Sequence, residues 1–413
     1  MRLAGTTVQV PLEGKGGDKV ELSDFERPPG LRGIHGSPGT HANFDHDHWI
    51  GQIQEMGICL YKLMDDGSAS VLQFARKLRA KGIMPIVRMW AERPNPGTLS
   101  SKALSTVKTY VDEGITRWFE VNNEPNLPYE WRSGEWRSGG RPELVTQNWL
   151  TDAESIIEMG GYPAFPALAQ CSHNPDASSI RWYIDAFEWM ARSAASTARE
   201  VFSRGAWIAS HDGVLNHCYR DGDGDWHFEY PYDPICQADK PGRTIMDDDN
   251  SLIGHRVAVQ LLKEHFDLVV PVMSTEGGVF VPYDAVVQWD SRYPGYDVNG
   301  HAERTVAMYR WLEDNAPDYY FGMCPWLIAS ELMGHPPGPW SKDCWFWVGQ
   351  ELPVVAAVKQ MGPPRTGPRP EPKERVRLVS KWMTDEEVEE WLQTFSQHEQ
   401  FRTLFHREKK GDR

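Results

Sequence analysis

Short apolar segments alternate with amphipathic segments eight times between residues 30 and 362. The apolar segments, which we expect to form strands, cover residues 31–35, 59–64, 83–90, 118–124, 162–170, 206–211, 268–276 and 320–328. Stretches with helical periodicity follow them, and several of these end at a glycine, which is a helix-stop signal. Strands that alternate with helices predict a parallel sheet. Eight such units predict an α/β fold, a closed (β/α)8 TIM barrel with long loops at its C-terminal face.

An open, doubly wound sheet is the main alternative for such an alternation. A sheet of that kind would need a Gly-x-Gly-x-x-Gly turn after its first strand. The corresponding segment, Gly33-Ile34-His35-Gly36-Ser37-Pro38-Gly39, does not have this spacing. The closed barrel is therefore the better prediction.

The chain of 413 residues extends beyond the expected barrel at both ends. The expected parts are an N-terminal extension at residues 1–29, the barrel at residues 30–362, and a Pro-rich linker with a helical tail at residues 363–413. In the extension, residues 6–10 are predicted to form a strand that closes the bottom of the barrel. In the tail, residues 363–372 form the Pro-rich spacer, and residues 384–400 have the pattern of an amphipathic helix.

The fourth expected strand ends in an Asn-Glu-Pro turn. Residues 118–126 read Trp-Phe-Glu-Val-Asn-Asn-Glu-Pro-Asn. Pro125 cannot donate a hydrogen bond to a sheet, and it biases Glu124 toward an extended conformation. We therefore expect the strand to end with Glu124 at its C-terminal tip, where such barrels carry their catalytic groups. A carboxylate there, beside the amide of Asn123, is suited to proton transfer to a leaving oxygen.

The seventh expected strand ends in a second carboxylate. The residues Ser274-Thr275-Glu276-Gly277-Gly278 close this strand, and the two glycines let the backbone turn tightly and leave Glu276 uncrowded. Because strands four and seven lie across the barrel from each other, Glu124 and Glu276 should flank a central pocket. Two carboxylates about 5 Å apart can hydrolyse a glycoside with retention: one attacks the anomeric carbon, and the other protonates the departing oxygen and then activates water.

On these two motifs the chain resembles the retaining glycoside hydrolases of clan A, such as families 5 and 39. The resemblance covers residues 30–362 at the level of strand order. It implies Glu124 as the acid/base, Glu276 as the nucleophile and Asn123 as a hydrogen-bond donor to the sugar 2-hydroxyl. It also implies that Trp326, in the eighth strand, floors the sugar site. The two motifs do not select one family of the clan.

The second strand departs from the family 5 pattern. Members of that family commonly carry an arginine at the end of strand two, near the nucleophile, whereas this chain has Lys62 and Asp65 there. An arginine, Arg88, lies in the third strand instead. The sequence therefore leaves open which cation, if any, stabilises the negative charge of the nucleophile. For Lys62, Arg88 and Glu120 we favour a paired polar layer inside the barrel over a chemical role, since buried charges need partners.

Other side chains at strand ends are candidates for the pocket wall. His35 ends the first strand, and His211 and Asp212 end the sixth. His211 could equally be a structural histidine with satisfied hydrogen bonds. The expected substrate-binding residues are Asn123, His35, Arg88, His211 and Trp326. The tryptophans on expected loops, some of which should stack on sugar rings, are Trp131, Trp136, Trp226, Trp289, Trp340 and Trp345.

Composition narrows the classes of partner. The formal net charge of −15 and the lack of a basic stripe disfavour a nucleic-acid partner. No apolar run reaches the roughly 18 residues of a transmembrane helix, so no membrane partner is expected. The N-terminus, Met1-Arg2-Leu3-Ala4-Gly5, lacks the apolar segment of a signal peptide. This leaves open a cytoplasmic location or a trimmed form of an exported protein.

The six cysteines do not predict a metal site. None belongs to a Cys-x-x-Cys pair, so a structural zinc is not expected. Cys218 with Cys236, and Cys324 with Cys344, share long loops and could form disulfides. Reduced thiols are the better default for a chain without an export signal.

An acidic run at Asp221-Gly222-Asp223-Gly224-Asp225 is similar to a calcium loop. An EF-hand has glycine at its sixth position and glutamate at its twelfth, where this chain has Trp226 and Tyr232. We therefore favour a solvated acidic turn over a metal site.

The sequence as a whole predicts a retaining glycosidase that cleaves a β-linked glycan or glycoside without a cofactor or metal. Two alternatives stay open. A metal-dependent hydrolase on the same barrel would draw on His35, His41, His46, His48 and His211, although the first strand has no His-x-His. A non-catalytic barrel would bind carbohydrate and show no turnover, since one fold hosts many functions.

Overall fold

The computed structural model describes residues 21–36, 45–132, 134–137, 140–282, 285–329, 341–347 and 350–365. The chain divides into two compact units, Met1–Pro372 and Lys373–Arg413, and all described residues belong to the first. The strand predicted at residues 6–10, the helix predicted at residues 384–400 and most of the Pro-rich spacer lie outside the described residues. The domain boundaries at residues 29/30 and 362/363 stay predictions.

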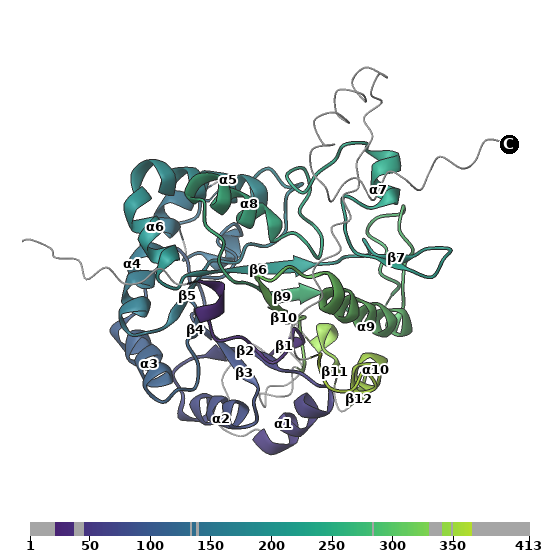
Figure 1. Cartoon of the computed structure of the whole chain (residues 1–413), viewed down its shortest axis with the longest axis horizontal. Helices are drawn as coiled ribbons and strands as arrows, with labels where there is room; N and C mark the ends of the chain where they lie inside the picture. Colours follow the sequence, from purple (N-terminus) through teal and green to yellow (C-terminus); the bar gives the residue numbers. More distant parts are fainter. Residues whose placement is uncertain are drawn as a thin grey trace, which may run out of the picture. The chain divides into compact units, whose positions relative to one another are not determined.

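Eight parallel strands form one sheet in sequence order. They are β1 (Gly33–His35), β2 (Leu60–Asp65), β3 (Met84–Met89), β4 (Trp118–Glu120), β5 (Tyr162–Phe165), β6 (Trp207–Gly213), β9 (Val272–Gly278) and β10 (Tyr320–Met323). A parallel bridge between Arg32 and Met323 joins the two outer strands. The sheet therefore closes into a (β/α)8 TIM barrel, which confirms the predicted fold (Figure 1).

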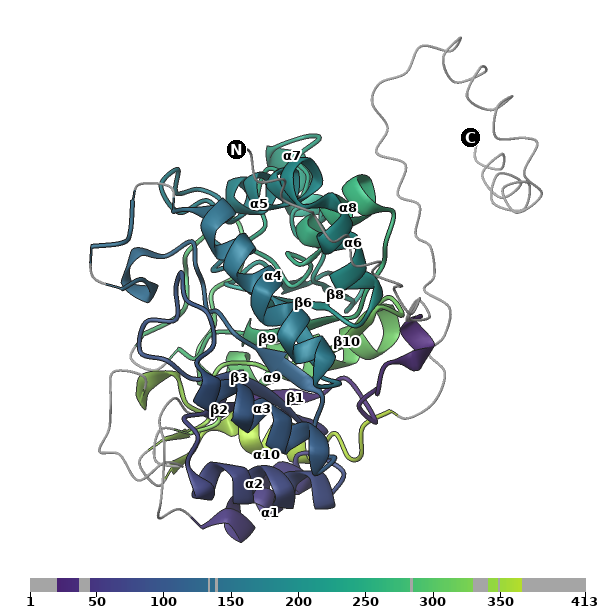
Figure 2. The ribbon, with the colours of Figure 1, turned by 90° about the vertical axis from the view of Figure 1, so that its left-hand side faces the viewer.

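Helices surround the strands (Figure 1). They are α1 (His46–Glu55), α2 (Ala69–Ala80), α3 (Ser101–Asp112), α4 (Pro142–Glu158), α5 (Ser179–Ser193), α6 (Ala195–Ser203), α8 (Arg256–Phe266), α9 (Val298–Asn315) and α10 (Pro353–Lys359). Serine caps start several of them: the Ser68 hydroxyl accepts from Val71 N, and the Ser100 hydroxyl accepts from Ala103 N. In Figure 2, α3 and α4 face the viewer along one side of the barrel.

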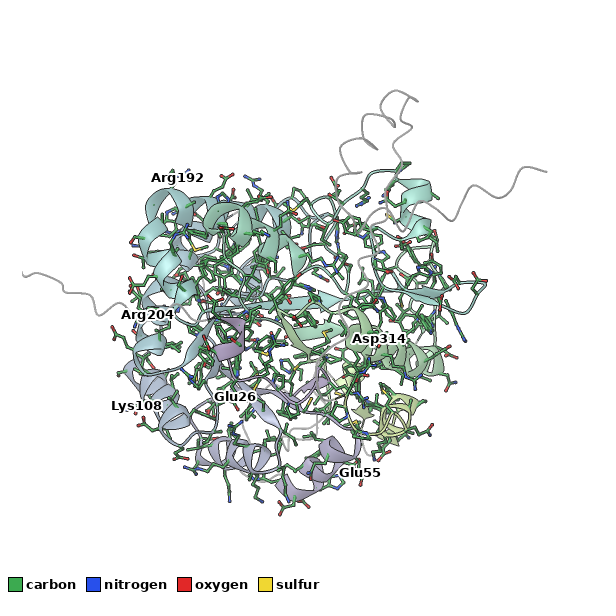
Figure 3. The ribbon with its side chains drawn as sticks, viewed as in Figure 1. Glu26, Glu55, Lys108, Arg192, Arg204 and Asp314 are labelled. Atoms are coloured by element: carbon green, nitrogen blue, oxygen red, sulfur yellow. The ribbon has the colours of Figure 1, made fainter. Side chains whose placement is uncertain are left out.

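The helical layer carries its charged side chains on the outside. Figure 3 shows Lys108, Arg192 and Arg204 at the outer edge of the barrel, and all three are exposed. Each helix of this layer is thus amphipathic in the sense that the sequence predicted. No helix in the described segments combines the length and the hydropathy that crossing a bilayer would require.

Two strand boundaries differ from the sequence prediction. The helical segment between β5 and β6 is two helices, α5 and α6, because the backbone leaves the helical region at Ala194, where φ is −144°. Strand β5 ends at Phe165 and β10 ends at Met323, so both are shorter than the apolar runs that predicted them. Pro163 nevertheless lies within β5.

Short elements decorate the loops. They are η1 (Leu22–Asp24), η2 (Pro128–Glu130), β7 (Tyr219–Arg220), β8 (Trp226–His227), α7 (Pro234–Asp239), η4 (Ser341–Asp343), β11 (Phe346–Trp347) and β12 (Gln350–Glu351). The acidic run is the turn between β7 and β8. Asp221 Oδ1 accepts from the backbone N–H groups of Asp223 and Asp225, and Asp221 Oδ2 lies 2.8 Å from His227 Nε2. The carboxylate of Asp221 therefore holds its own hairpin together.

The N-terminal end of the barrel is filled with aromatic side chains. Phe25 lies against Trp118 and Tyr162, with ring centroids 5.7 Å and 4.8 Å apart. Trp118 in turn contacts Trp207 at 5.5 Å and Phe321 at 5.8 Å. All five are buried, so a residue of the N-terminal segment closes this end of the barrel.

No disulfide links any of the six cysteines, all of which lie among the described residues. Cys218 and Cys236 are buried, as are Cys324 and Cys344. The reduced state that the sequence favoured therefore holds in this structure, and neither of the two loop disulfides is formed.

Candidate active site

Glu124 lies past the end of β4, in a backbone conformation that differs from the prediction. The strand ends at Glu120, and Glu124 has a φ of +37° instead of the extended conformation expected before a proline. The segment is fixed from outside: Glu124 N donates to Ala167 O at 3.0 Å, and Asn95 Nδ2 donates to Asn123 O at 2.7 Å. A left-handed φ at a residue that is not glycine is unfavourable and is kept only where the surroundings impose it, often at functional sites.

Glu276 lies at a bulge near the end of β9. Opposite β6, Ser210 pairs with Ser274 and His211 pairs with Glu276, so β9 holds one extra residue, Thr275. The Ser274 hydroxyl accepts from Asp212 N at 3.0 Å and donates to Glu276 O at 3.0 Å, which ties the two strands at the bulge. A bulge re-aims the side chains beside it. This one places Glu276 next to His211.

The two glycines after Glu276 have the role that the sequence predicted. Gly277 has a φ of +110° and Gly278 a φ of +79°, conformations that L side chains rarely adopt. A Cβ on Gly277 would also lie 2.5 Å from Asp212 O. The turn behind Glu276 is therefore open to glycine alone.

The structure brings Glu124, His211 and Glu276 together. One carboxylate oxygen from each glutamate and a ring nitrogen of His211 all lie within 4.8 Å of one another. His211 Nδ1 is 2.8 Å from Glu124 Oε1, and His211 Nε2 is 3.8 Å from Glu276 Oε2. His35 Nε2 approaches the same Glu276 oxygen at 3.6 Å. Two carboxylates and two imidazoles thus share one small site.

The charges of this site are coupled. Burial raises the pKa of Glu276, and the neighbouring Glu124 raises it further, while His211, Arg88 and Lys62 oppose the shift. Glu276 therefore keeps its proton to a higher pH than an isolated glutamate.

The two histidines differ in protonation. Burial works to lower the pKa of His211, but Glu276 and Glu124 outweigh burial and raise it. Burial lowers the pKa of His35 well below its usual value, and the cations Lys62 and Arg88 add to this, so His35 is neutral. Its Nδ1 lies against Gly36 O and must carry the proton, which leaves Nε2 as an acceptor. His211 is the donor of the pair.

Asn123 is held between a cation and a third carboxylate. Arg88 Nη1 donates to Asn123 Oδ1, and the Asn123 side chain also hydrogen bonds Glu130, from η2. Burial raises the pKa of Glu130, with Arg88 opposing and Glu124 adding to the shift. Arg88 is therefore placed to orient Asn123. The sequence analysis missed Glu130, whose only signal was its position shortly after the Asn-Glu-Pro turn.

Lys62 and Glu120 form the buried ion pair that the sequence favoured. Lys62 Nζ contacts Glu120 Oε2, and both side chains are almost fully buried. Arg88 does not join this pair, because its guanidinium binds Asn123. The expected polar layer therefore holds for two of its three members.

Trp326 lies beside the carboxylates, three residues after the C-terminal end of β10. Its backbone N–H donates to Gly277 O at 3.0 Å, and its ring meets the His35 ring edge-on at 4.6 Å. The side chain is half-buried. Asp212 points away from this group: its carboxylate accepts from Ser210 Oγ at 2.9 Å and lies 3.1 Å from His255 Nδ1. Asp212 is thus a structural residue and not part of the pocket wall.

The five loop tryptophans that the structure describes fall into three groups by burial. Trp131 and Trp345 are buried, so the expectation that they could stack on a ligand is wrong. Trp136 and Trp226 are half-buried, and Trp340 lies outside the described residues. Trp289 is 58% exposed. These loops had no hydrophobic periodicity from which burial could be predicted.

Glu124, His211 and Glu276 are also the one group of three potential metal ligands found among the described residues. Of the other histidines of the metal-hydrolase alternative, His35 approaches Glu276 at 3.6 Å but is not part of this group of three. His46 and His48 lie on α1, where His46 Nε2 is 3.4 Å from Ser70 Oγ, and His41 lies outside the described residues. A metal would thus compete for the two glutamates.

Comparison with known proteins finds a likeness in structure only. No protein-family model matches the chain, and no curated protein sequence matches it. A family 39 glycoside hydrolase from Bacteroides cellulosilyticus WH2 matches with 11% identity and a TM-score of 0.47, over 81% of this chain and 63% of that one. A GH128 subgroup II endo-β-1,3-glucanase from Pseudomonas viridiflava matches with 13% identity and a TM-score of 0.45, over 81% and 98%. A family 1 β-glucosidase from Thermotoga maritima matches with 12% identity and a TM-score of 0.38, over 73% and 88%.

At these identities and TM-scores the matches carry no argument about substrate or mechanism. The site's own geometry has to supply one. In its structure the chain is similar to glycoside hydrolases built on a TIM barrel.

Proposed function

We propose that this protein is a retaining glycosidase that acts on β-linked sugars. The observation that supports this most is the separation of the two glutamates, whose nearest oxygens lie within 4.8 Å of each other. Retaining enzymes hold their carboxyl groups about 5–5.5 Å apart, whereas inverting enzymes leave about 6.5–9.5 Å for a water molecule. Both glutamates also lie at the C-terminal ends of barrel strands, where such folds carry their active sites.

Glu276 is the nucleophile in this proposal. Its carboxylate faces Nε2 of both His35 and His211, and the charges of Arg88 and Lys62 favour its ionised form. Burial works against ionisation. The raised pKa of Glu276 therefore does not by itself favour this role, which rests on the cations around it and on its position at the end of β9.

Glu124 is the acid/base. It has two acidic neighbours, Glu276 and Glu130, and its side chain lies 2.8 Å from His211 Nδ1. In the first step Glu124 gives its proton to the departing oxygen while a Glu276 oxygen bonds to the anomeric carbon. In the second step Glu124 takes a proton from water, the water oxygen bonds to that carbon, and the ester bond to Glu276 breaks.

The histidines offer one sugar hydroxyl a matched pair of contacts. The Nε2 atoms of His35 and His211 are buried, and neither has a hydrogen-bond partner in the described part of the chain. His211 Nε2 is a donor and His35 Nε2 an acceptor, and both face Glu276. Buried polar atoms without partners are costly unless a ligand or water fills them. A hydroxyl beside the anomeric carbon would satisfy both.

The stereochemistry of the product tests the proposal. Aryl β-glycosides of several sugars are hydrolysed in an NMR tube, and the first anomer released is read from its proton spectrum. The β-anomer is expected. A first product in the α-configuration would mean inversion and would contradict the assignment of Glu276 as nucleophile.

Anionic rescue assigns the two roles. With azide present, the Glu276→Ala variant should form an α-glycosyl azide, because azide attacks directly in place of the missing carboxylate. The Glu124→Ala variant should form the β-glycosyl azide, because azide then attacks the glycosyl-enzyme ester. The reverse pattern would exchange the two roles.

A metal-dependent hydrolase is the second candidate, since Glu124, His211 and Glu276 could hold a cation. It predicts that a chelator abolishes activity and that a divalent ion restores it. The glycosidase predicts the opposite: EDTA leaves the rate unchanged, and added Zn²⁺ inhibits by binding the two glutamates. One titration of the same preparation distinguishes the two.

A further inference from the structure

Large apolar side chains are exposed almost entirely at one end of the barrel. Among the described residues, those more than a third exposed are Trp90 (42%), Tyr129 (64%), Val269 (43%), Phe280 (38%), Val286 (59%) and Trp289 (58%). All four aromatic members follow the C-terminal end of a strand: β3, β4 or β9. Val269 alone precedes a strand. These aromatic rings thus lie at the end of the barrel that carries the active site in this fold, where they can contact a ligand.

The four rings lie on opposite sides of the barrel mouth. Trp90 directly follows β3, and Tyr129 lies in η2, after β4. Phe280 and Trp289 follow β9. In the closed order of eight strands, β3 and β9 are four strands apart and therefore face each other across the barrel. Glu124 follows β4, on the side of the first group of rings, and Glu276 lies near the end of β9, on the side of the second. We name the two groups the β3 platform (Trp90 and Tyr129) and the β9 platform (Phe280 and Trp289).

The β3 platform is close to the reacting groups. Trp90 N donates to Asp65 O at 2.8 Å, which continues the pairing of β2 and β3 to the rim. Tyr129 lies in η2, five residues after Glu124, and directly precedes Glu130. A ligand at the two glutamates would therefore extend directly over this platform.

The β9 platform is braced. The rings of Phe280 and Trp289 meet edge-on at 5.0 Å, and Phe280 O accepts from Tyr296 Oη at 2.9 Å. Beyond Trp289, Asn216 Nδ2 donates to Asp290 O at 2.9 Å and Asp290 N donates back to Asn216 Oδ1 at 3.1 Å. An exposed tryptophan on a loop fixed in this way is available to a ligand without an ordering cost.

We propose that the mouth of the barrel is an open cleft that binds a neutral, β-linked polysaccharide across both platforms and cleaves it internally. This inference rests on the proposed glycosidase function and adds to it the class of substrate. A single sugar at the carboxylates would need one aromatic surface, whereas a chain that extends to both sides would use all four rings. Sugar rings have apolar faces that stack on such side chains.

The charge of the site favours a neutral polymer. The mouth holds three carboxylates, Glu124, Glu130 and Glu276, and the guanidinium of Arg88 donates to Asn123. The chain as a whole carries a net charge of −15. A polymer of uronic acids would be repelled by this field.

The test compares a polymer with a small substrate in single variants of the full chain. The polymers are soluble β-1,3-glucan, β-1,4-glucan and β-1,4-mannan, and the small substrate is the aryl β-glycoside of the same sugar. For Trp90→Ala and for Trp289→Ala, the ratio of kcat/KM on the polymer to kcat/KM on the aryl glycoside should fall about tenfold. Val286→Ala and Val269→Ala, equally exposed but not aromatic, should leave this ratio at the wild-type value.

The pattern of early products is the second measurement. Internal cleavage should release oligosaccharides of mixed length before any monosaccharide accumulates. Release of monosaccharide or disaccharide alone from the start would overturn the proposal, as would unchanged ratios in both tryptophan variants. A preference for alginate over the neutral polymers would contradict the charge argument.

Failure of this inference can be told from failure of the glycosidase function. If the wild type hydrolyses aryl β-glycosides but the tryptophan variants keep the wild-type ratio, the function stands and the cleft is wrong. If no glycoside is turned over, affinity electrophoresis through gels that contain each polymer still reports binding. Retardation of the wild type that is lost in Trp289→Ala would support the cleft without catalysis, and no retardation in any gel would refute it.

Discussion

The two ends of the barrel use aromatic side chains in opposite ways. At the N-terminal end, Phe25, Trp118 and Tyr162 pack against one another and are buried. At the C-terminal end, Trp90 and Trp289 project into solvent. This difference agrees with a general rule for the fold, in which the N-terminal end contributes to stability and the C-terminal end carries the active site. The same residue type can therefore be assigned a role only once its end of the barrel is known.

Polar groups follow the same division. The buried cluster at the N-terminal end is built from apolar and aromatic side chains, whereas the C-terminal end holds two carboxylates close together and two buried imidazole nitrogens that have no hydrogen-bond partner among the described residues. Such unsatisfied groups reduce stability and persist where function requires them. Substitutions at the two ends should thus separate activity from stability, and the following predictions test that separation.

The largest effect is expected for Glu276→Ala. Without the nucleophile, kcat on an aryl β-glycoside should fall by more than about 10⁴-fold. The free energy of unfolding should be unchanged or slightly higher, because a buried carboxylate crowded by Glu124 has been removed. Enzyme kinetics and urea denaturation check the two parts. Glu154→Ala, on the exposed face of α4, is the control for both, and a large loss of stability in Glu276→Ala would break the comparison.

Trp118→Ala should have the reverse profile. The side chain contacts Phe25, Trp207 and Phe321 and is fully buried, so its removal should lower the free energy of unfolding by about 3–5 kcal/mol. The kcat of the molecules that remain folded should stay at the wild-type value. Trp289→Ala is the matched control, a tryptophan at the other end, and should change stability by less than about 0.5 kcal/mol. Equal destabilisation by both variants would show that the two ends do not differ.

The Lys62–Glu120 pair lies between the two ends and sharpens the comparison. Lys62→Met leaves the buried Glu120 carboxylate without its partner and should cost about 3 kcal/mol of stability. The double variant Lys62→Met/Glu120→Leu should recover most of this loss, since neither charge remains. A double variant as unstable as the single one would mean that the pair itself, and not the unpaired charge, decides stability.

Glu130→Gln should have a smaller effect on catalysis. The amide keeps the shape of the side chain but weakens its hydrogen bond to Asn123, so kcat/KM should fall by about threefold to tenfold. Arg88→Lys, which alters the other contact of Asn123, should have an effect of the same order. If both variants had wild-type kinetics, the orientation of Asn123 by Arg88 and Glu130 would not contribute to catalysis.

The smallest effect concerns pH. The pKa of His211 is raised in the folded chain, so its charge contributes stability that is fully present below its usual pKa of 6.5 and is lost as pH rises through the raised value. The stability difference between the wild type and His211→Asn should therefore shrink as pH increases above 6.5. Urea denaturation from pH 5.5 to 9 measures it. His48→Asn, exposed on α1, is the control, and a difference that grows with pH in His211→Asn would have the wrong sign.

The sequence predicted the barrel, and the placement of two glutamates in one site, because both depend on local patterns. Eight apolar runs set the strands, and Glu124 and Glu276 stand beside a proline and two glycines that mark strand ends. The backbone at Glu124 could not be predicted in the same way. The rule for residues before proline favours an extended conformation, but hydrogen bonds from distant residues impose a φ of +37°.

The positions of side chains on loops were the second feature that could not be predicted from the sequence. Glu130 joins the site through a short helix, η2, that has no sequence signature, and Trp90 looked like the last residue of a strand. Trp131 appeared available on a loop, yet its indole N–H donates to Pro125 O at 2.7 Å and the ring is buried. Burial of loop residues depends on contacts that are distant in sequence, so periodicity does not report it.

Trapping the covalent intermediate tests the proposed mechanism most directly. A 2-deoxy-2-fluoro β-glycoside of the sugar that is hydrolysed best slows both chemical steps, so the glycosyl ester accumulates and can be located by intact mass and peptide mapping. We predict one fluoroglycosyl adduct per chain, on Glu276, and none in Glu276→Ala. An adduct on Glu124, or turnover to an inverted product with no adduct, would contradict the two-glutamate retaining mechanism as assigned.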